Sequence, residues 1–269
     1  MRTGELKGKV AFITGAAGAI GSAISYAFIR ESAKVVIVDI DKERLFSLKK
    51  EMDGAYKNNA VMPVVADVRN SAAIRKAFKM TMERFKRLDI LVNNAAATQI
   101  KPVDRVQDKD IDLVVDTNLK GYIKCAREAV KIMKGRDIKG VLLFVSSKNG
   151  IEGASDKCLY SAAKGGELVL ARALAKELGP FGIRVNSICP DAVIEGSSLW
   201  EDESYRLGTC KRYGISEAEI PQHYKNRCAL KTNIGPEDVA NAALFLVSEK
   251  ASKITGAILT VDGGVAFVR

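Results

Sequence analysis

Strand-like and helix-like segments alternate along this chain of 269 residues. Short runs rich in valine and isoleucine predict strands at Val10–Thr14, Lys34–Asp39, Val61–Ala66, Asp89–Val92, Val141–Val145, Ile183–Ile188 and Ala257–Val261. Helical apolar spacing follows at Ala19–Arg30, Lys42–Met52, Ala72–Phe85, a long region ending near Lys134, Cys158–Leu178 and Pro236–Ser248. Because strands joined by helix-length crossovers pair in parallel, we predict one doubly wound α/β domain over residues 1–269, with a seven-stranded parallel sheet and helices on both faces.

The alternation is interrupted once, between Asp191 and Arg227, where polar, aromatic and short helical pieces follow one another. No linker, low-complexity stretch or internal repeat divides the chain. We therefore predict that this stretch is an insert of the same domain and that it carries substrate-binding groups.

A glycine-rich turn joins the first predicted strand to the first helix, at Thr14-Gly-Ala-Ala-Gly-Ala-Ile-Gly21. A strand that turns into a helix leaves free backbone N–H groups at the helix N-terminus, and such groups bind phosphate. The spacing of Gly15, Gly18 and Gly21 differs from the usual G-x-G-x-x-G, so a tight turn without a ligand is the alternative. We predict a phosphate-binding turn.

Composition argues against several other functions. The net charge is +10, but basic residues are interspersed with acidic ones, and no basic arm or aromatic platform predicts nucleic-acid binding. The cysteines form no C-x-x-C pair and His223 is the single histidine, so we expect neither a metal site nor a Ser–His–Asp triad. No apolar run is long enough for a membrane span and no signal peptide is visible, which predicts a cytoplasmic protein without a membrane segment.

Asp39 ends the second predicted strand, at the edge of the sheet where doubly wound domains bind ligands. It lies 18 positions after Gly21, about where an acidic residue binds the ribose 2′-hydroxyl of NAD. Its carboxylate would repel the 2′-phosphate of NADP, and no lysine or arginine occupies positions 16, 17 or 40 to receive that phosphate. We therefore expect NAD as the cofactor. The alternative role for Asp39 is a helix N-cap, for which Asp41 is better placed.

Tyr160 and Lys164 lie four positions apart on a predicted helix, so both side chains leave the same face one turn apart. A phenol has a pKa of about 10, but a neighbouring ammonium and an oxidised nicotinamide both favour the phenolate. The pair therefore suits general acid–base chemistry without histidine. Ser146-Ser147 ends the fifth predicted strand and adds hydroxyl groups at the same edge of the sheet.

Several motifs, in order, resemble the short-chain dehydrogenase/reductase family over essentially the full length of the chain. They are the turn Thr14–Gly21, Asn93-Asn-Ala-Ala96, Asn118-Leu-Lys-Gly121, Ser147 at its interval of 13 positions before Tyr160, and Tyr160-Ser-Ala-Ala-Lys164. The resemblance implies a Rossmann-like fold, a nicotinamide cofactor and the interconversion of an alcohol and a carbonyl group on a small-molecule substrate. It also implies a homotetramer or homodimer, built through the helices that bear Asn118 and Tyr160.

The resemblance implies roles at the matching positions. Tyr160 would exchange a proton with the substrate oxygen, and Ser147 would hydrogen-bond to that oxygen. Lys164 would hold the nicotinamide ribose and lower the pKa of Tyr160, and Asn118 would anchor a water molecule that passes protons to solvent. The implied cofactor-binding residues are Gly15, Gly18, Ala19, Ile20, Asp39, Ile40, Asp67, Val68, Asn94, Ala95, Tyr160, Lys164 and Pro190.

Three departures from the family pattern bear on cofactor and substrate contacts. Ala19 stands where glycine is usual, so its methyl group would crowd the pyrophosphate unless the turn shifts. Ala96 also replaces a glycine, near the nicotinamide. Asp191 follows Pro190 where glycine is usual, and Glu195 stands where a threonine often binds the carboxamide.

The run from Asn186 to Trp200 resembles the dehydrogenase half of bifunctional rhamnulose-phosphate aldolase/lactaldehyde dehydrogenases, which share its Pro-Asp-Ala-Val…Gly-Ser…Trp pattern. This resemblance covers mainly residues 186–264 and implies a small hydroxylated or sugar-derived substrate. Trp200 and the tyrosines at 205, 213 and 224 would form a lid or cover the core. The candidate substrate-binding residues are Asn149, Asp191, Glu195 and Trp200.

Three functions stay open at this point. The leading one is the NAD(H)-dependent interconversion of an alcohol and a carbonyl on a small hydroxylated or sugar-derived substrate. The second is a 3-oxoacyl-acyl-carrier-protein reductase, which Asp39 disfavours because such reductases generally prefer NADPH. The third is a non-catalytic NAD-binding regulator or a nucleic-acid binder, for which an intact set of Ser147, Tyr160 and Lys164 would be unnecessary.

Overall fold

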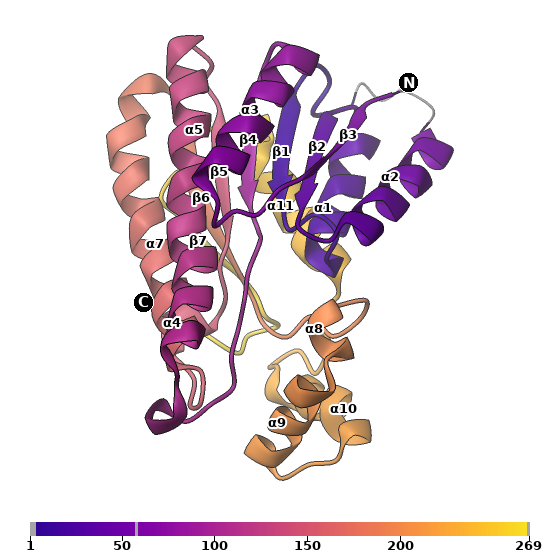
Figure 1. Ribbon diagram of the computed structural model, residues 1–269, viewed down its shortest axis with the longest axis vertical. Coiled ribbons are helices and arrows are strands. Elements are labelled where there is room, and N and C mark those ends of the chain that lie inside the picture. Colours follow the sequence, from indigo (N-terminus) through magenta and orange to yellow (C-terminus); the bar gives the residue numbers. More distant parts are fainter. Residues whose placement is uncertain (1–3, 57–58, 268–269) are drawn as a thin grey trace.

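Seven parallel strands form the centre of the molecule, in the order β3-β2-β1-β4-β5-β6-β7 (Figure 1). The computed structural model describes residues 4–56 and 59–267. The strands are β1 (Val10–Thr14), β2 (Lys34–Asp39), β3 (Val61–Val65), β4 (Ile90–Asn93), β5 (Val141–Val145), β6 (Arg184–Pro190) and β7 (Ile258–Val261). The winding reverses between β1 and β4, which opens a crevice at the carboxyl ends of these strands. The predicted Rossmann-like α/β fold is confirmed.

Helices cover both faces of the sheet because each strand sends alternate side chains to opposite faces. Ala11 and Ile13 of β1 pack with α1, α2 and α11, whereas Val10 and Phe12 pack with α3, α5 and α7. The helices of these two layers are α1 (Ala19–Arg30), α2 (Lys42–Tyr56) and α11 (Pro236–Val247) on the first face, and α3 (Ser71–Phe85), α5 (Gly121–Gly135) and α7 (Cys158–Leu178) on the second.

Shorter helices extend these layers or connect them. They are α4 (Asp108–Val114), the π-helix η2 (Val115–Lys120), α6 (Asn149–Glu152), and the 3₁₀ turns η1 (Val103–Arg105), η3 (Gly179–Phe181) and η5 (Glu249–Ala251). The long helical region predicted to end near Lys134 is therefore divided into α4, η2 and α5. Among the described residues, no helix combines the length and the apolar character that crossing a bilayer requires.

The segment of residues 198–227, here called the cap, stands apart from the two helical layers (Figure 1). It contains α8 (Ser198–Glu201), α9 (Glu203–Tyr213), the turn η4 (Glu217–Glu219) and α10 (Ile220–Arg227). Trp200 packs edge-on against Tyr205 and Tyr224, with ring centroids 5.0 and 5.6 Å apart. These rings and Ile220 form a small apolar cluster, so the aromatic residues of the cap hold it together as well as face the cleft described below.

Candidate functional site

A cleft of about 750 Å³ follows the carboxyl ends of the central strands and is closed on one side by the cap. Its wall includes most of the residues singled out in the sequence: Gly15, Gly18, Ala19, Ile20, Asp39, Ile40, Asp67, Val68, Asn94, Ala95, Ser147, Asn149, Tyr160, Asp191 and Trp200. Asn118, Lys164 and Pro190 are buried and lie outside that wall, and Glu195 is exposed outside it.

The glycine turn is shaped by close backbone contacts. Gly15 has φ +62°, and a Cβ there would lie 2.7 Å from the Cα of Ala95. A Cβ on Gly21 would lie 2.1 Å from the carbonyl oxygen of Gly15. Gly18 has room for a side chain, but as the N-cap of α1 it leaves the first helical amides without a side-chain cap. The helix that starts at Ala19 therefore presents free amides to the cleft, a cradle that fits a pyrophosphate.

Asp39 fixes the geometry of this turn. Its carboxylate accepts hydrogen bonds from the backbone N–H of Ala17 and of Asp41, each at 3.0 Å. Arg44 of α2 also lines the cleft, and its guanidinium contacts Asp41 at 3.3 Å and Glu201 of the cap at 2.6 Å. Sequence reasoning missed this cation, whose only signal is its position one helical turn after Asp41.

Asn94 joins the ends of β1 and β4. Its side-chain amide donates to the carbonyl oxygens of Thr14 at 3.1 Å and Gly15 at 2.9 Å. The hydroxyl of Thr14 accepts from the backbone N–H of Asn94 and of Ala95, at 3.0 and 3.2 Å. These bonds hold the crevice open at the point where the strand order reverses.

Asp67 and Val68 follow β3 and form the far wall of the cleft. The guanidinium of Arg69 makes hydrogen bonds of 2.7 to 3.1 Å to the carboxylate of Asp67, and this holds the pKa of Asp67 below its ordinary value. Asp67 therefore stays an ionised acceptor at neutral pH.

Tyr160 faces the cleft from the first turn of α7. Ser147 lines the same cleft, and its hydroxyl accepts from the backbone N–H of Asn149 at 3.1 Å. Burial raises the pKa of Tyr160, whereas the ammonium of Lys164 and the hydroxyl of Ser147 lower it. Burial outweighs both, so the pKa of Tyr160 is raised on balance, although Lys164 acts in the predicted, lowering direction.

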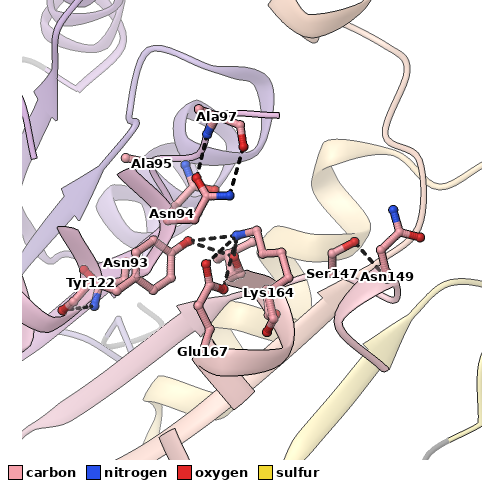
Figure 2. A network of polar contacts seen from close by, with 12 residues as sticks. Asn93, Asn94, Ala95, Ala97, Tyr122, Ser147, Asn149, Lys164 and Glu167 are labelled. Carbon is pink, nitrogen blue, oxygen red and sulfur yellow. Dashed lines mark hydrogen bonds and ion pairs between the residues drawn. The ribbon is translucent and has the colours of Figure 1, made fainter. Parts of the chain in front are cut away.

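Lys164 lies behind Tyr160, with its ammonium 5.8 Å from the centre of the phenol ring. That ammonium contacts the two carboxylate oxygens of Glu167 at 3.0 and 3.2 Å and donates to the carbonyl oxygen of Val145 at 2.9 Å and to the hydroxyl of Tyr122 at 3.2 Å (Figure 2). Lys164 is 1% exposed and Glu167 is fully buried.

Burial opposes the charge on both members of this pair. It raises the pKa of Glu167, against the attraction of Lys164. Burial alone lowers the pKa of Lys164, but the charge of Glu167 and the nearby phenols outweigh it and leave that pKa raised, so the ammonium is retained. Sequence reasoning missed Glu167, although an acidic residue three positions after Lys164 on a largely apolar helix is a visible signal.

Asn118 lies in the π-helix η2, a local widening of the helix that is common at functional sites. Its side chain is fully buried, accepts a hydrogen bond from the backbone N–H of Ala97 at 2.7 Å and donates to the carbonyl oxygen of Ala97 at 2.9 Å. These bonds fix the loop after β4 against the helix. The predicted role of Asn118 in holding a water molecule stays a prediction.

The side of the cleft next to the cap contains more cations than the sequence reasoning identified. Asp191 contacts the guanidinium of Arg227 through both oxygens, at 3.1 Å each. Burial raises the pKa of Asp191 and Arg227 acts against that rise. Lys157 and Arg212 also line this side. Among residues 4–56 and 59–267, no three His, Cys, Asp or Glu side chains form a group that could hold a metal ion.

Comparison with known proteins identifies the family. A family model described as enoyl-(acyl carrier protein) reductase matches residues 15–266. The chain belongs to the short-chain dehydrogenase/reductase family. It is therefore an oxidoreductase that acts on CH–OH or carbonyl groups, in a family that binds a nicotinamide cofactor.

Individual relatives include proteins of different sizes and substrates. The uncharacterized oxidoreductase YuxG of Bacillus subtilis is 41% identical over 98% of this chain, which spans only 39% of the length of YuxG. The crystal structure of sorbitol-6-phosphate 2-dehydrogenase SrlD from Erwinia amylovora has a TM-score of 0.90 and 28% identity, covering 96% of this chain and 100% of SrlD.

A second crystal structure, 3-ketoacyl-(acyl-carrier-protein) reductase from Brucella melitensis complexed with NADH, has a TM-score of 0.83 and 29% identity. It covers 97% of this chain and 100% of the reductase. These comparisons do not show the predicted resemblance to rhamnulose-phosphate aldolase/lactaldehyde dehydrogenases, which therefore stays unconfirmed.

Proposed function

We propose that this short-chain dehydrogenase/reductase uses NAD(H) to interconvert an alcohol and a carbonyl group on a small hydroxylated or sugar-derived substrate. The observation that carries the proposal is the position of the Tyr160 phenol. It faces the cleft, shares the cleft wall with Ser147 and lies in front of the buried ammonium of Lys164. A positioned acid–base group of this kind favours proton transfer in the cleft over cofactor binding alone.

The proton chemistry follows from the positions of these side chains. In oxidation, the phenolate of Tyr160 accepts the proton of the substrate hydroxyl, and in reduction the phenol returns a proton to the carbonyl oxygen. Ser147 donates a hydrogen bond to the same oxygen and so holds it against Tyr160. The hydride chemistry at the reacting carbon would be supplied by a nicotinamide held in the cleft. Lys164, kept charged by Glu167, stabilises the phenolate from behind the ring.

The cleft offers groups for each part of the dinucleotide. The first amides of α1 would bind the pyrophosphate, with Gly15, Gly18, Ala19 and Ile20 at the turn. Other wall residues would hold the adenosine and nicotinamide parts, namely Asp39, Ile40, Asp67, Val68, Asn94 and Ala95. Pro190 and Lys164 are buried outside this wall, and contacts with the nicotinamide part are proposed for them as well.

We expect the wild-type protein to bind NADH at least about tenfold more tightly than NADPH, because Asp39 repels a 2′-phosphate. Asp39→Asn removes the charge but keeps an oxygen for the N–H of Ala17. It should therefore reduce the ratio of NADH affinity to NADPH affinity, mainly by increasing the affinity for NADPH. Quenching of protein fluorescence measures both affinities, with Asp53→Asn on α2 as the matched control. Equal affinity of the wild type for both cofactors would mean that Asp39 does not select NAD.

A panel of polyols, hydroxyaldehydes and sugars, set against 3-oxoacyl thioesters, tests the substrate class by the change in NADH absorbance. We expect a higher kcat/KM for the polyols, hydroxyaldehydes and sugars than for the thioesters. The family model and the Brucella reductase favour the competing function, a 3-oxoacyl-acyl-carrier-protein reductase, and preferential turnover of the thioesters would establish it. Cofactor binding without turnover of either group would instead indicate a non-catalytic regulator.

A homotetramer is our further proposal for the assembly, as the family resemblance implies. Exposed apolar side chains lie on the adjacent helices α4, α5 and α7, namely Ile111, Ile123 and Val169 (Figure 1). Such residues are more often found at an interface than facing water when they gather on neighbouring helices. A cytoplasmic location also stays a prediction.

A further inference from the structure

Two cations without an acidic partner line the cleft beside Tyr160. Lys157 lies three residues before Tyr160, is 6% exposed, and places its ammonium 6.0 Å from the centre of the Tyr160 ring. Arg212 comes from the last turn of α9 in the cap, and its Nε is buried without a hydrogen-bond partner. Within the described part of the chain, neither side chain is within ion-pair distance of a carboxylate.

The acidic residue whose charge acts on Lys157 is already engaged. Asp191 contacts Arg227 through both carboxylate oxygens at 3.1 Å. The ammonium of Lys157 instead donates to the neutral hydroxyl of Tyr205 at 2.7 Å and lies 4.8 Å from the centre of that ring. A buried ammonium that has only a phenol as its partner is an unbalanced charge, and such charges are costly unless an anion compensates them.

We propose that Lys157 and Arg212 form an anion-binding subsite for the carboxylate or phosphate of the substrate, whose reacting CH–OH or carbonyl group lies at Tyr160. This inference rests on the function proposed above. Lys157 supplies a compact positive charge, and the planar guanidinium of Arg212 supplies the paired donors that suit both kinds of oxyanion. Because Arg212 belongs to the cap and Lys157 to the body of the domain, the bound anion also joins the two.

The position of Lys157 limits the size of the substrate. Lys157 and Tyr160 lie three positions apart at the start of α7, on the same side of the helix. The anionic group and the reacting oxygen are therefore only a few bonds apart, as in a short hydroxy acid or a small sugar phosphate. The reacting end of a 3-oxoacyl thioester has no anionic group at that distance.

The subsite is distinct from the cradle for the cofactor phosphates. That cradle lies at the end of β1, whereas Lys157 follows β5, and β4 lies between these two strands. Strands in a sheet are about 4.8 Å apart, so the two positions are separated by roughly 10 Å along the crevice. An anion at Lys157 consequently belongs to the substrate.

The charge of Lys157 depends on pH in the accessible range. Burial, followed by repulsion from Arg212, lowers the pKa of Lys157 to about 7. Asp191 acts in the opposite direction, whereas Lys148 and Arg227 add to the lowering. Anion affinity should therefore fall as pH rises through this range, and Lys157→Met should lose that dependence because Arg212 stays charged throughout.

The test compares matched pairs of substrates, a hydroxy acid with its amide and a polyol phosphate with the free polyol. We expect the wild type to prefer the anionic member of one pair. The pair that shows this preference identifies whether the subsite binds a carboxylate or a phosphate. Lys157→Met and Arg212→Met should each lower kcat/KM for the preferred anion by about 10- to 100-fold, mainly by raising KM. The kcat/KM for the neutral member of the pair should stay unchanged. Lys211→Met, the exposed neighbour of Arg212, is the matched control.

Binding without turnover separates this inference from the proposed function. With saturating NAD⁺ in the cofactor cradle, inorganic phosphate or acetate should raise the melting temperature of the wild type and of Lys211→Met, but of neither subsite variant. Three results would overturn the subsite. The wild type could prefer the neutral member of both pairs, or the subsite variants could lose kcat/KM equally for both members of a pair. The third is a shift in melting temperature that both subsite variants retain. Absence of turnover on every pair, with the melting shifts as expected, would overturn the proposed function alone.

Discussion

Tyr160→Phe should lower kcat by about 10²- to 10⁴-fold, the contribution typical of a positioned acid–base group. The substitution removes one hydroxyl and keeps the ring, so the packing at the start of α7 is retained. NADH affinity and the melting temperature should therefore stay close to those of the wild type. Stopped-flow or steady-state NADH absorbance measures the loss, and fluorescence quenching measures the cofactor affinity.

Tyr26→Phe is the matched control, because Tyr26 lies on α1 and its hydroxyl reaches only the exposed carboxylate of Glu51. It should leave kcat unchanged. If Tyr160→Phe keeps activity within a few-fold of the wild type, the acid–base role assigned to this phenol is wrong. A loss of NADH binding together with activity would point to a structural role instead.

The same phenol gives the two reaction directions different pH profiles. Oxidation needs the phenolate, and because burial raises the pKa of Tyr160, its rate should rise with pH through the alkaline range. Reduction needs the protonated phenol, so its rate should stay level until the phenol ionises. An oxidised nicotinamide in the cleft would shift the oxidation profile toward lower pH, because its positive charge favours the phenolate. The reduction profile would lack this shift, because the reduced nicotinamide is neutral.

Much of the fold follows from local signals in the sequence. The runs of β-branched residues predict β1, β2 and β5 with the bounds that the structure has, and Gly179-Pro180 correctly marks the end of α7. The sixth strand is displaced, from the predicted Ile183–Ile188 to Arg184–Pro190, because pairing with β7 extends it to Pro190. Local periodicity cannot anticipate such a tertiary contact.

The site was harder to predict wherever it depends on side chains brought together by the fold. Motif spacing placed Tyr160 and Ser147 at one cleft, but no motif shows that Lys164 lies behind the wall of that cleft. The burial of Lys157 depends on the cap folding over it, since its partner Tyr205 is 48 positions away. A charge that tertiary packing buries looks like an ordinary surface lysine in the sequence.

The division of the helix around Asn118 is a further example. Helical periodicity predicts a continuous helix, whereas the structure contains a π-helix at Val115–Lys120. The two hydrogen bonds between the side chain of Asn118 and the backbone of Ala97 reach across 21 positions and hold the widened turn in place. The residue type was recognised from its motif, but its local geometry depends on that distant partner.

Glu167→Leu should lower the free energy of unfolding by about 3–5 kcal/mol, because it leaves the ammonium of Lys164 buried without a counter-charge. The carbonyl oxygen of Val145 and the hydroxyl of Tyr122 still accept from that ammonium, but neither balances its charge. Urea unfolding followed by circular dichroism measures the loss. Glu177→Leu, at an exposed position of the same helix, should change stability by less than about 0.5 kcal/mol.

The double variant Lys164→Met with Glu167→Leu separates the charge from the packing. It removes both ions and fills the space with apolar side chains of similar length, so it should recover most of the stability that Glu167→Leu loses. A double variant as unstable as Glu167→Leu would show that the loss comes from packing around position 167. If Glu167→Leu itself is as stable as Glu177→Leu, then the ion pair with Glu167 does not stabilise the fold, and the buried carboxylate is not what holds the ammonium behind Tyr160.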